Sequence, residues 1–225
     1  MRNWPGFAIL LTLSLGAFAA GLSGITNQEA NSGLKEALLQ GSSAAVAKLG
    51  VPDGFLGNPK VKIPLPPSLN KAEKMMRMFG MGKQADELVV TMNRAAESAV
   101  PEAKPLLIDA VKRMSVQDAK GILTGGNDSV TQYFARTTSP ALTAKFLPIV
   151  KRATDKVGLA QQYNAFVGKG ARYGLVKEKD ANIESYVTQK TLGGLFLMIG
   201  EEERAIRSNP LGQASNLLKK VFGAL

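Results

Sequence analysis

A loop with two adjacent glycines, residues 124–128, holds the polar side chains best placed for binding chemistry. Glycines between two helical segments allow left-handed backbone angles, which point successive N–H groups to one side and form an anion-binding nest. In the helix that follows, polar residues spaced four apart share one face. We therefore predict a site for a carboxylate or phosphate formed by Thr124, Gly125, Gly126, Asp128, Gln132, Tyr133 and Arg136.

The same loop also has an explanation that needs no ligand. A glycine after one helix and an Asn or Asp before the next are ordinary capping residues, and a four-residue spacing of polar groups is an ordinary surface ladder. A third interpretation makes the chain a hydrolase or another enzyme, with Asp128, Tyr133 and Arg136 lining a cleft. Polar groups from residues 161–164 or 186–189 would then face them. The sequence leaves these interpretations open and assigns no catalytic residue.

Methionines cluster in residues 75–81. Met75 and Met78 lie one helical turn apart, and two thioethers are suitable ligands for Cu(I). A flexible apolar surface for a lipid or a partner is a second interpretation, and core packing is a third. Because Phe79 follows directly, we expect core packing here, and we expect no metal site and no cofactor in the protein.

Two other groups lack the spacing or the companion motifs that catalysis requires. Residues 201–203 are three consecutive glutamates, which on a helix point in three directions and cannot face one another as the paired carboxylates of glycosidases do. Glu203 and Arg207 are four apart, which predicts a surface ion pair. Ser68 and Lys71 match the start of a Ser-Lys hydrolase motif, but the further motifs of those enzymes are missing. We therefore expect Ser68 to cap a short helix.

The chain of 225 residues contains no histidine and no cysteine, and its formal net charge is +10. It lacks the side chains that most often bind metals, act as nucleophiles and transfer protons near neutral pH. A basic protein favours anionic partners, although dispersed positive charge also serves solubility. We expect a lipid or an anionic envelope component as the partner. We expect no nucleic acid, because the chain is predicted to be exported.

The N-terminus has the pattern of a cleaved signal peptide, residues 1–19. Arg2 precedes an apolar run over residues 7–15, and residues 17–19 read Ala-Phe-Ala, the small-x-small pattern before a cleavage site. The run is shorter than the roughly 20 residues that a membrane-spanning helix needs, so a retained anchor is the weaker alternative. We therefore predict a periplasmic or secreted protein made of residues 20–225.

Helical patterns cover most of this mature chain, and strand patterns are nearly absent. Capping boxes at Thr26 and Ser115 predict helix starts, and Ser139 before Pro140 predicts another. No repeat or linker divides the chain. We therefore predict an all-α fold, a single multi-helix bundle-like domain.

Three segments give this domain its predicted organisation. A Pro/Gly-rich arm, residues 51–67, follows the first helix, and residues 60–65 within it are the candidate extended strand. A long helix over residues 183–207 carries an apolar stretch at 192–199, which predicts the buried centre of the fold. Residues 217–222 predict a short amphipathic tail helix that docks on the body or contacts a membrane surface weakly.

Several segments also share their order and residues with one protein family. They are Ala37-Leu38, Asn58-Pro59-Lys60-Val61-Lys62-Ile63-Pro64-Leu65-Pro66, Met92-Asn93-Arg94-Ala95-Ala96-Glu97, Ile122-Leu123-Thr124-Gly125-Gly126, Tyr133-Phe134, Tyr186-Val187-Thr188-Gln189 and Lys219-Lys220-Val221-Phe222. The chain thus resembles, over essentially all of its mature length, an exported bacterial family catalogued as domain of unknown function 4197. The resemblance implies an exported and mostly helical protein, and it brings no reaction, substrate or catalytic residue.

These observations favour a non-enzymatic envelope protein that binds an apolar or anionic partner. The alternatives are the enzyme described above, with its site around residues 124–138, and a structural or assembly factor of the cell envelope. The sequence does not determine the oligomeric state.

Overall fold

The computed structural model describes residues 26–80, 82–126, 128–172 and 182–209. The regular elements in these ranges are all helices, which confirms the all-α prediction. The predicted signal peptide and the predicted tail helix lie outside the described residues. In chain order the elements are α1 (Asn27–Leu49), η2 (Pro67–Leu69), α2 (Asn70–Met78), α3 (Gly82–Ala99), η3 (Val100–Glu102), α4 (Ala103–Arg113), α5 (Val116–Thr124), α6 (Ser129–Thr154), α7 (Gly158–Arg172) and α8 (Ile183–Ser208).

Both predicted capping boxes begin a helix. At the start of α1, Thr26 Oγ1 accepts a hydrogen bond from Glu29 N at 3.1 Å, and Glu29 Oε2 accepts one from Thr26 N at 2.9 Å. Ser115 and Asp118 form the same reciprocal pair at the start of α5. Asn182 caps α8 with its side chain. Each cap satisfies N–H groups that a helix start leaves without partners, so a few neighbouring residues suffice to specify it.

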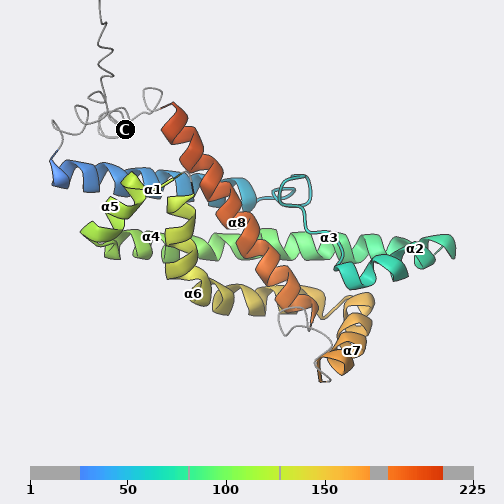
Figure 1. The fold of residues 1–225 in the computed structure, drawn as a ribbon. Helices are drawn as coiled ribbons and strands as arrows, with labels where there is room; N and C mark the ends of the chain where they lie inside the picture. The colour runs from blue at the N-terminus through green and yellow to red at the C-terminus, as the bar shows by residue number, and fades with distance from the viewer. Residues whose placement is uncertain (1–25, 81, 127, 173–181, 210–225) are drawn as a thin grey trace, which may run out of the picture.

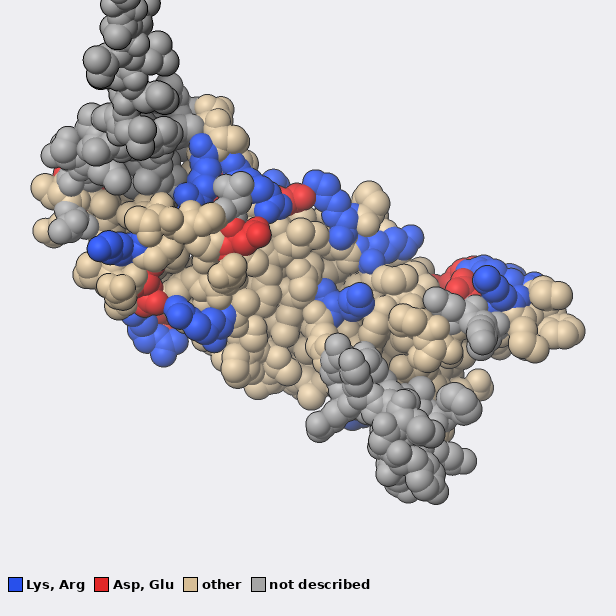
Figure 2. Space-filling view, viewed as in Figure 1, with Lys and Arg blue, Asp and Glu red and all other residues tan. Residues whose placement is uncertain are grey.

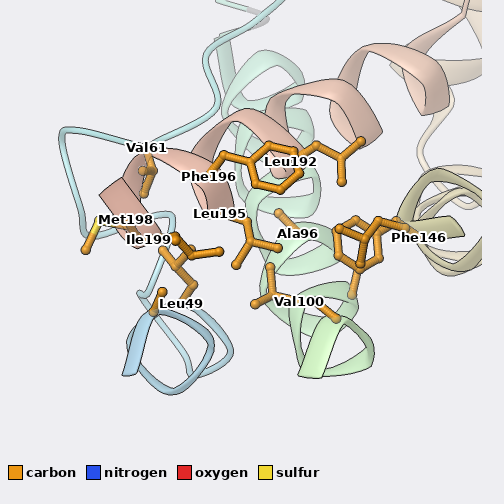
Figure 3. Packing of buried hydrophobic residues seen from close by; sticks show 14 of the residues in the cluster. Leu49, Val61, Ala96, Val100, Phe146, Leu192, Leu195, Phe196, Met198 and Ile199 are labelled. Carbon is orange, nitrogen blue, oxygen red and sulfur yellow. The ribbon is translucent and has the colours of Figure 1, made fainter. Parts of the chain in front are cut away.

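Helix α8 runs through the centre of the fold and contacts α6, α1 and α3 (Figure 1). Figure 3 shows Leu195 and Ile199 of α8 facing the side of the core that contains Leu49 and Val100. All four side chains are buried. Residues 192–199 lie at the buried centre of the fold as predicted, except for Gly193 and Leu197, which are exposed. The apolar stretch of α8 therefore holds together helices from both halves of the sequence.

A non-helical segment, residues 51–66, connects α1 to η2 and packs against α3 and α8. Phe55 is fully buried, and a Cβ atom added at Gly194 would lie 2.7 Å from its ring. Glycine at this position of α8 therefore lets the segment approach the helix. The candidate strand in this segment forms no ladder with other described residues, because Ile63 bonds to the side chain of Asn93 instead of to a second strand.

Helix α6 continues through Ser139 and Pro140, so the helix start predicted there is wrong. The helix changes direction near its middle in Figure 1, as expected where a proline removes a backbone donor. Continuity is favoured because the buried residues before and after the proline form one face at four-residue intervals, and a break would separate them. These residues are Phe134, Thr138, Leu142 and Phe146.

The cap predicted at Ser68 is also wrong. Ser68 lies in η2, and its Oγ donates to the hydroxyl oxygen of Tyr163 at 3.3 Å. Leu69 holds the N-cap position of α2 and makes no side-chain cap. Ser68 thus connects the start of α2 to α7, and this tertiary contact replaces the local one.

Candidate functional site

The described residues of the predicted anion-binding loop do not have the backbone geometry of a nest. Gly125 has φ −80° and ψ 169°, which is extended rather than left-handed. Among the described glycines, only Gly80 has a positive φ. The N–H of Ser129 is bonded to the carbonyl of Gly126 and so closes the turn. The expectation of left-handed glycines at this loop is therefore wrong.

The polar side chains of that predicted site bind separate partners. Arg136 pairs with Asp118 of α5 at 2.8 Å, whereas Asp128 lies 3.4 Å from Arg204 of α8. Thr124 Oγ1 donates to the carbonyl of Lys120 in its own helix, and Gln132 is exposed. The structure therefore places these side chains around the start of α6 without directing them to a common point.

Tyr133 is buried and faces inward. Its hydroxyl donates to the carbonyl of Ala110 at 2.7 Å, and burial raises the pKa of its phenol. The guanidinium of Arg136 lies 5.9 Å from the centre of the Tyr133 ring, so it covers the outer face of the ring. Tyr133 thus joins α6 to α4, and its hydroxyl does not face the side chain of Asp128 on the surface.

Three of the residues proposed to face this site bind other partners. Tyr186 donates to the carbonyl of Pro64 at 3.1 Å, and Tyr163 receives the hydrogen bond from Ser68. Asn164 bonds to Glu184 and to the backbone N–H of Ile183. The described residues therefore do not assemble the cleft that the enzyme interpretation requires.

Glu203 forms the expected ion pair with Arg207 at 3.0 Å, but Glu203 is buried and Arg207 is only partly exposed, so the pair is not at the surface. Glu203 Oε1 also accepts from Ser129 Oγ, whereas Oε2 has no hydrogen-bond partner in the described part of the chain. Burial raises the pKa of Glu203, and Arg207 opposes that shift. The sequence pattern missed the burial because α1 covers this turn of α8 only in the tertiary structure.

A small cavity of about 20 Å³ lies beside Glu203, lined by apolar side chains of α1, α6 and α8. That volume suits one water molecule. It is far below the several hundred Å³ of ordinary ligand pockets. This cavity is therefore too small to enclose an acyl chain.

The surface feature that stands out is the apolar end of the α2–α3 hairpin, which we call the hairpin tip and define as Met75, Met78 and Phe79. Their exposed fractions are 59%, 82% and 71%. Figure 1 shows the hairpin projecting from the body, and in Figure 2 the outermost end of this projection carries uncharged atoms with charged side chains behind them. The expectation that this segment packs in the core is wrong for these three residues.

Two local features build the tip. Gly80 has a φ of 75°, which ends α2 and lets the chain reverse into α3. Arg77 lies between Glu73 and Asp86, at 2.8 and 2.6 Å, and so ties α2 to α3. Hydrogen bonding to Arg77 lowers the pKa of Asp86. The turn and this ion-pair network hold the apolar side chains on the outside of the hairpin.

Two lysines adjoin the hairpin tip in the sequence. Lys74 and Lys83 are exposed, and no ion pair joins either of them to another described residue. Within the described ranges, no group of three acidic side chains gathers in a way that could hold a metal ion. The tip is thus an apolar projection with two cations beside it.

The fold and the tip together define a helical protein with an exposed apolar hairpin. The chain matches the family described as "Protein of unknown function (DUF4197)" over residues 24–223 and belongs to that family. No curated protein and no solved structure matches the chain. None of the helices in the described ranges combines the length and the apolar character that crossing a bilayer requires.

Proposed function

We propose that this protein is an exported envelope protein that binds the surface of a lipid bilayer by inserting its hairpin tip. The observation that carries the proposal is the exposure of Met75, Met78 and Phe79 together at the end of a projection. Large apolar side chains gathered on a soluble surface are typical of interaction sites. We favour a bilayer as the binding partner because a narrow projection is better suited to insertion into lipid than to broad contact with a second protein.

The energetics agree with reversible binding. Moving a Met or Phe side chain from water to an apolar medium is worth roughly 1.5–3 kcal/mol. Three such side chains supply several kcal/mol, and the loss of translational freedom on binding offsets part of this. Methionine also adapts to irregular surroundings, since its side chain is flexible and polarizable. We therefore expect attachment that depends on the tip and is reversible on dilution.

Two observations favour surface binding over the other interpretations. The cavity beside Glu203 is too small for a lipid chain, which disfavours a carrier that encloses its ligand there. The polar groups around Tyr133 bind separate partners, which disfavours the enzyme. Export and the envelope location are supported by the N-terminal sequence pattern and by the resemblance to an exported family.

Flotation of the purified protein with phosphatidylcholine vesicles tests the proposal. We expect M78S/F79S to lower binding at least about tenfold, since it removes most of the exposed apolar surface. The matched control is V116S, because Val116 is 67% exposed on α5, away from the tip. Thermal melts should be the same for all three proteins. Equal binding by M78S/F79S and the wild type, or an equal loss in V116S, would contradict the proposal.

A further inference from the structure

The positive charge of the chain is concentrated in α6 and α7. Residues 129–172 contain seven Lys or Arg residues and one acidic residue, Asp155, a net charge of +6 within a chain of net charge +10. Neither helix contains an Asp or a Glu. Positive charge that is concentrated in one segment with so few counter-charges indicates an anionic partner. Solubility alone requires only dispersed charge.

Three of these cations face solvent without a counter-ion among the described residues. They are Lys145, Arg152 and Lys156, which are exposed, and we call them the cationic surface. Of the other basic residues in α6, Arg136 pairs with Asp118 and Lys151 pairs with Asp155. The cations of the cationic surface are therefore available to an external anion.

Helix geometry places these cations in one row. Lys145 and Arg152 are seven residues apart, which corresponds to about two turns and about 10 Å along one face. Lys156 follows in the turn that ends α6. Cations near a helix C-terminus also stabilise the helix dipole, which accounts in part for Arg152 and Lys156. Lys145 lies more than two turns before the end, so the dipole does not explain it.

The C-terminal end of α6, which carries Arg152 in its last turn, lies in the half of the fold from which the hairpin projects (Figure 1). Helix α7, which follows the cationic surface in the chain, contacts α3, and its Tyr163 bonds to Ser68 at the start of α2 (Figure 1). The row of cations therefore ends, at the C-terminus of α6, beside the helix that contacts the hairpin. Peripheral membrane proteins combine the same two elements, buried apolar area and attraction to anionic lipids.

We propose that Lys145, Arg152 and Lys156 bind the phosphate groups of anionic phospholipids in the bilayer that the hairpin tip enters. This inference rests on the proposed function and adds lipid selectivity to it. Each Lys or Arg near an anionic surface changes affinity about fivefold. Three of them therefore give a preference on the order of a hundredfold for anionic over neutral vesicles. Salt should reduce the preference, because the Debye length falls from about 30 Å at 0.01 M to about 8 Å at 0.15 M.

The test compares phosphatidylcholine vesicles with vesicles that also contain phosphatidylglycerol, at low and physiological salt. The variant is K145Q/R152Q/K156Q. Its matched control is K104Q/K112Q/K120Q, which removes the same charge from exposed lysines of α4 and α5 at the other end of the fold. In the first triple variant we expect the preference for phosphatidylglycerol over phosphatidylcholine to fall at least tenfold. Its binding to phosphatidylcholine and its melting temperature should equal those of the wild type. We expect the control to keep most of the preference.

Equal losses in the two triple variants would assign the preference to net charge and overturn the inference. Unchanged preference in the first variant would also overturn it. The proposed function fails separately, if the M78S/F79S variant binds phosphatidylcholine as the wild type does. Preference for phosphatidylglycerol that persists in M78S/F79S but is lost in the cationic triple variant would support the cationic surface, and the tip is judged by binding to phosphatidylcholine.

Discussion

The side-chain amide of Asn93 bonds to both backbone polar groups of Ile63. Asn93 Oδ1 accepts from Ile63 N at 2.8 Å, and Asn93 Nδ2 donates to Ile63 O at 2.9 Å and to Val89 O at 2.8 Å. Asn93 and Ile63 are both fully buried. The Asn93 side chain on α3 thus satisfies the backbone N–H and C=O groups of Ile63, which a neighbouring strand would satisfy in a sheet. An extended segment can therefore lie in an all-helical core.

Replacing Asn93 with alanine should lower the free energy of unfolding by about 2–4 kcal/mol. The substitution leaves a buried N–H and a buried C=O of Ile63 without partners, and each unsatisfied group costs about 1–3 kcal/mol. Urea denaturation checks this. Ser98→Ala is the control, because the Ser98 hydroxyl is exposed and bonds only within α3, so we expect a change below about 0.5 kcal/mol. A similar small effect for both variants would contradict the role assigned to Asn93.

Glu97 holds the other end of the same segment. Its Oε1 accepts from the N–H groups of Phe55 and Leu56, both at 3.0 Å, and Arg94 pairs with its Oε2. We expect Glu97→Ala to cost about 2–4 kcal/mol, because two backbone donors lose a charged acceptor. Asp109→Ala removes only an exposed ion pair with Arg113 and should cost below about 1 kcal/mol. Equal midpoints in urea for the two variants would refute this assignment.

Glu203 predicts a pH dependence of stability. Burial raises its folded-state pKa above the ordinary value of 4.5, so the folded protein holds this proton more tightly than the unfolded chain does. The contribution of Glu203 is therefore fully present below the ordinary pKa and is lost as the pH rises through the raised one. We expect the wild type to lose stability relative to Glu203→Gln over that window.

The measurement for Glu203 is the difference in unfolding free energy between the wild type and Glu203→Gln at several pH values. The difference removes the common contributions of other titrating groups. Glu36→Gln, which alters an exposed glutamate of α1, controls for net charge. A difference that does not change with pH, or one that grows in the opposite direction, would show that Glu203 is not the group responsible.

Inorganic phosphate should not stabilise the protein through the loop at residues 124–128. Gly125 is extended, and Tyr133 is directed to Ala110 instead of to the loop. A bound ligand at a hundred times its Kd would add about 2.7 kcal/mol and raise the melting temperature. We therefore expect the wild type and Arg136→Ala to show the same difference in melting temperature between phosphate and chloride at matched ionic strength. A rise in phosphate that Arg136→Ala abolishes would reinstate the anion site.

The export prediction has a direct check in the mass of the protein isolated from cells. Residues 17–19 precede the predicted cleavage site, so we expect an N-terminus near Ala20 in protein from outside the cytoplasm. Blocking the site with Ala19→Arg should leave the precursor uncleaved. Full-length protein in the wild-type strain would contradict a cleaved signal.

Local sequence patterns were sufficient wherever a few adjacent residues specify a structure. The capping boxes at Thr26 and Ser115 each depend on contacts three residues apart, and both begin helices as predicted. The apolar stretch of α8 was also correctly assigned to the core, apart from the exposed Leu197. Such features need no knowledge of the rest of the fold, because their energies come from neighbouring residues or from composition.

The errors arise where distant segments decide the outcome. Pro140 lies inside α6 because the residues on both sides of it pack on a shared face, and that packing outweighs the missing hydrogen bond. Glu203 is buried because α1 covers it. Met75 and Met78 are exposed because α2 extends beyond the body. Periodicity predicts which residues share a face, but it does not predict which partner covers that face.

By itself, the sequence determined an all-helical chain of strongly basic character, the starts of several helices, the central apolar helix and the family. The tertiary structure alone decided which polar groups meet. It separated the residues of the predicted anion site, buried Glu203, exposed the hairpin tip and joined Asn93 to Ile63 across 30 residues. The physical reason is that helix formation and capping depend on short-range contacts. Burial and convergence depend instead on how whole helices pack together.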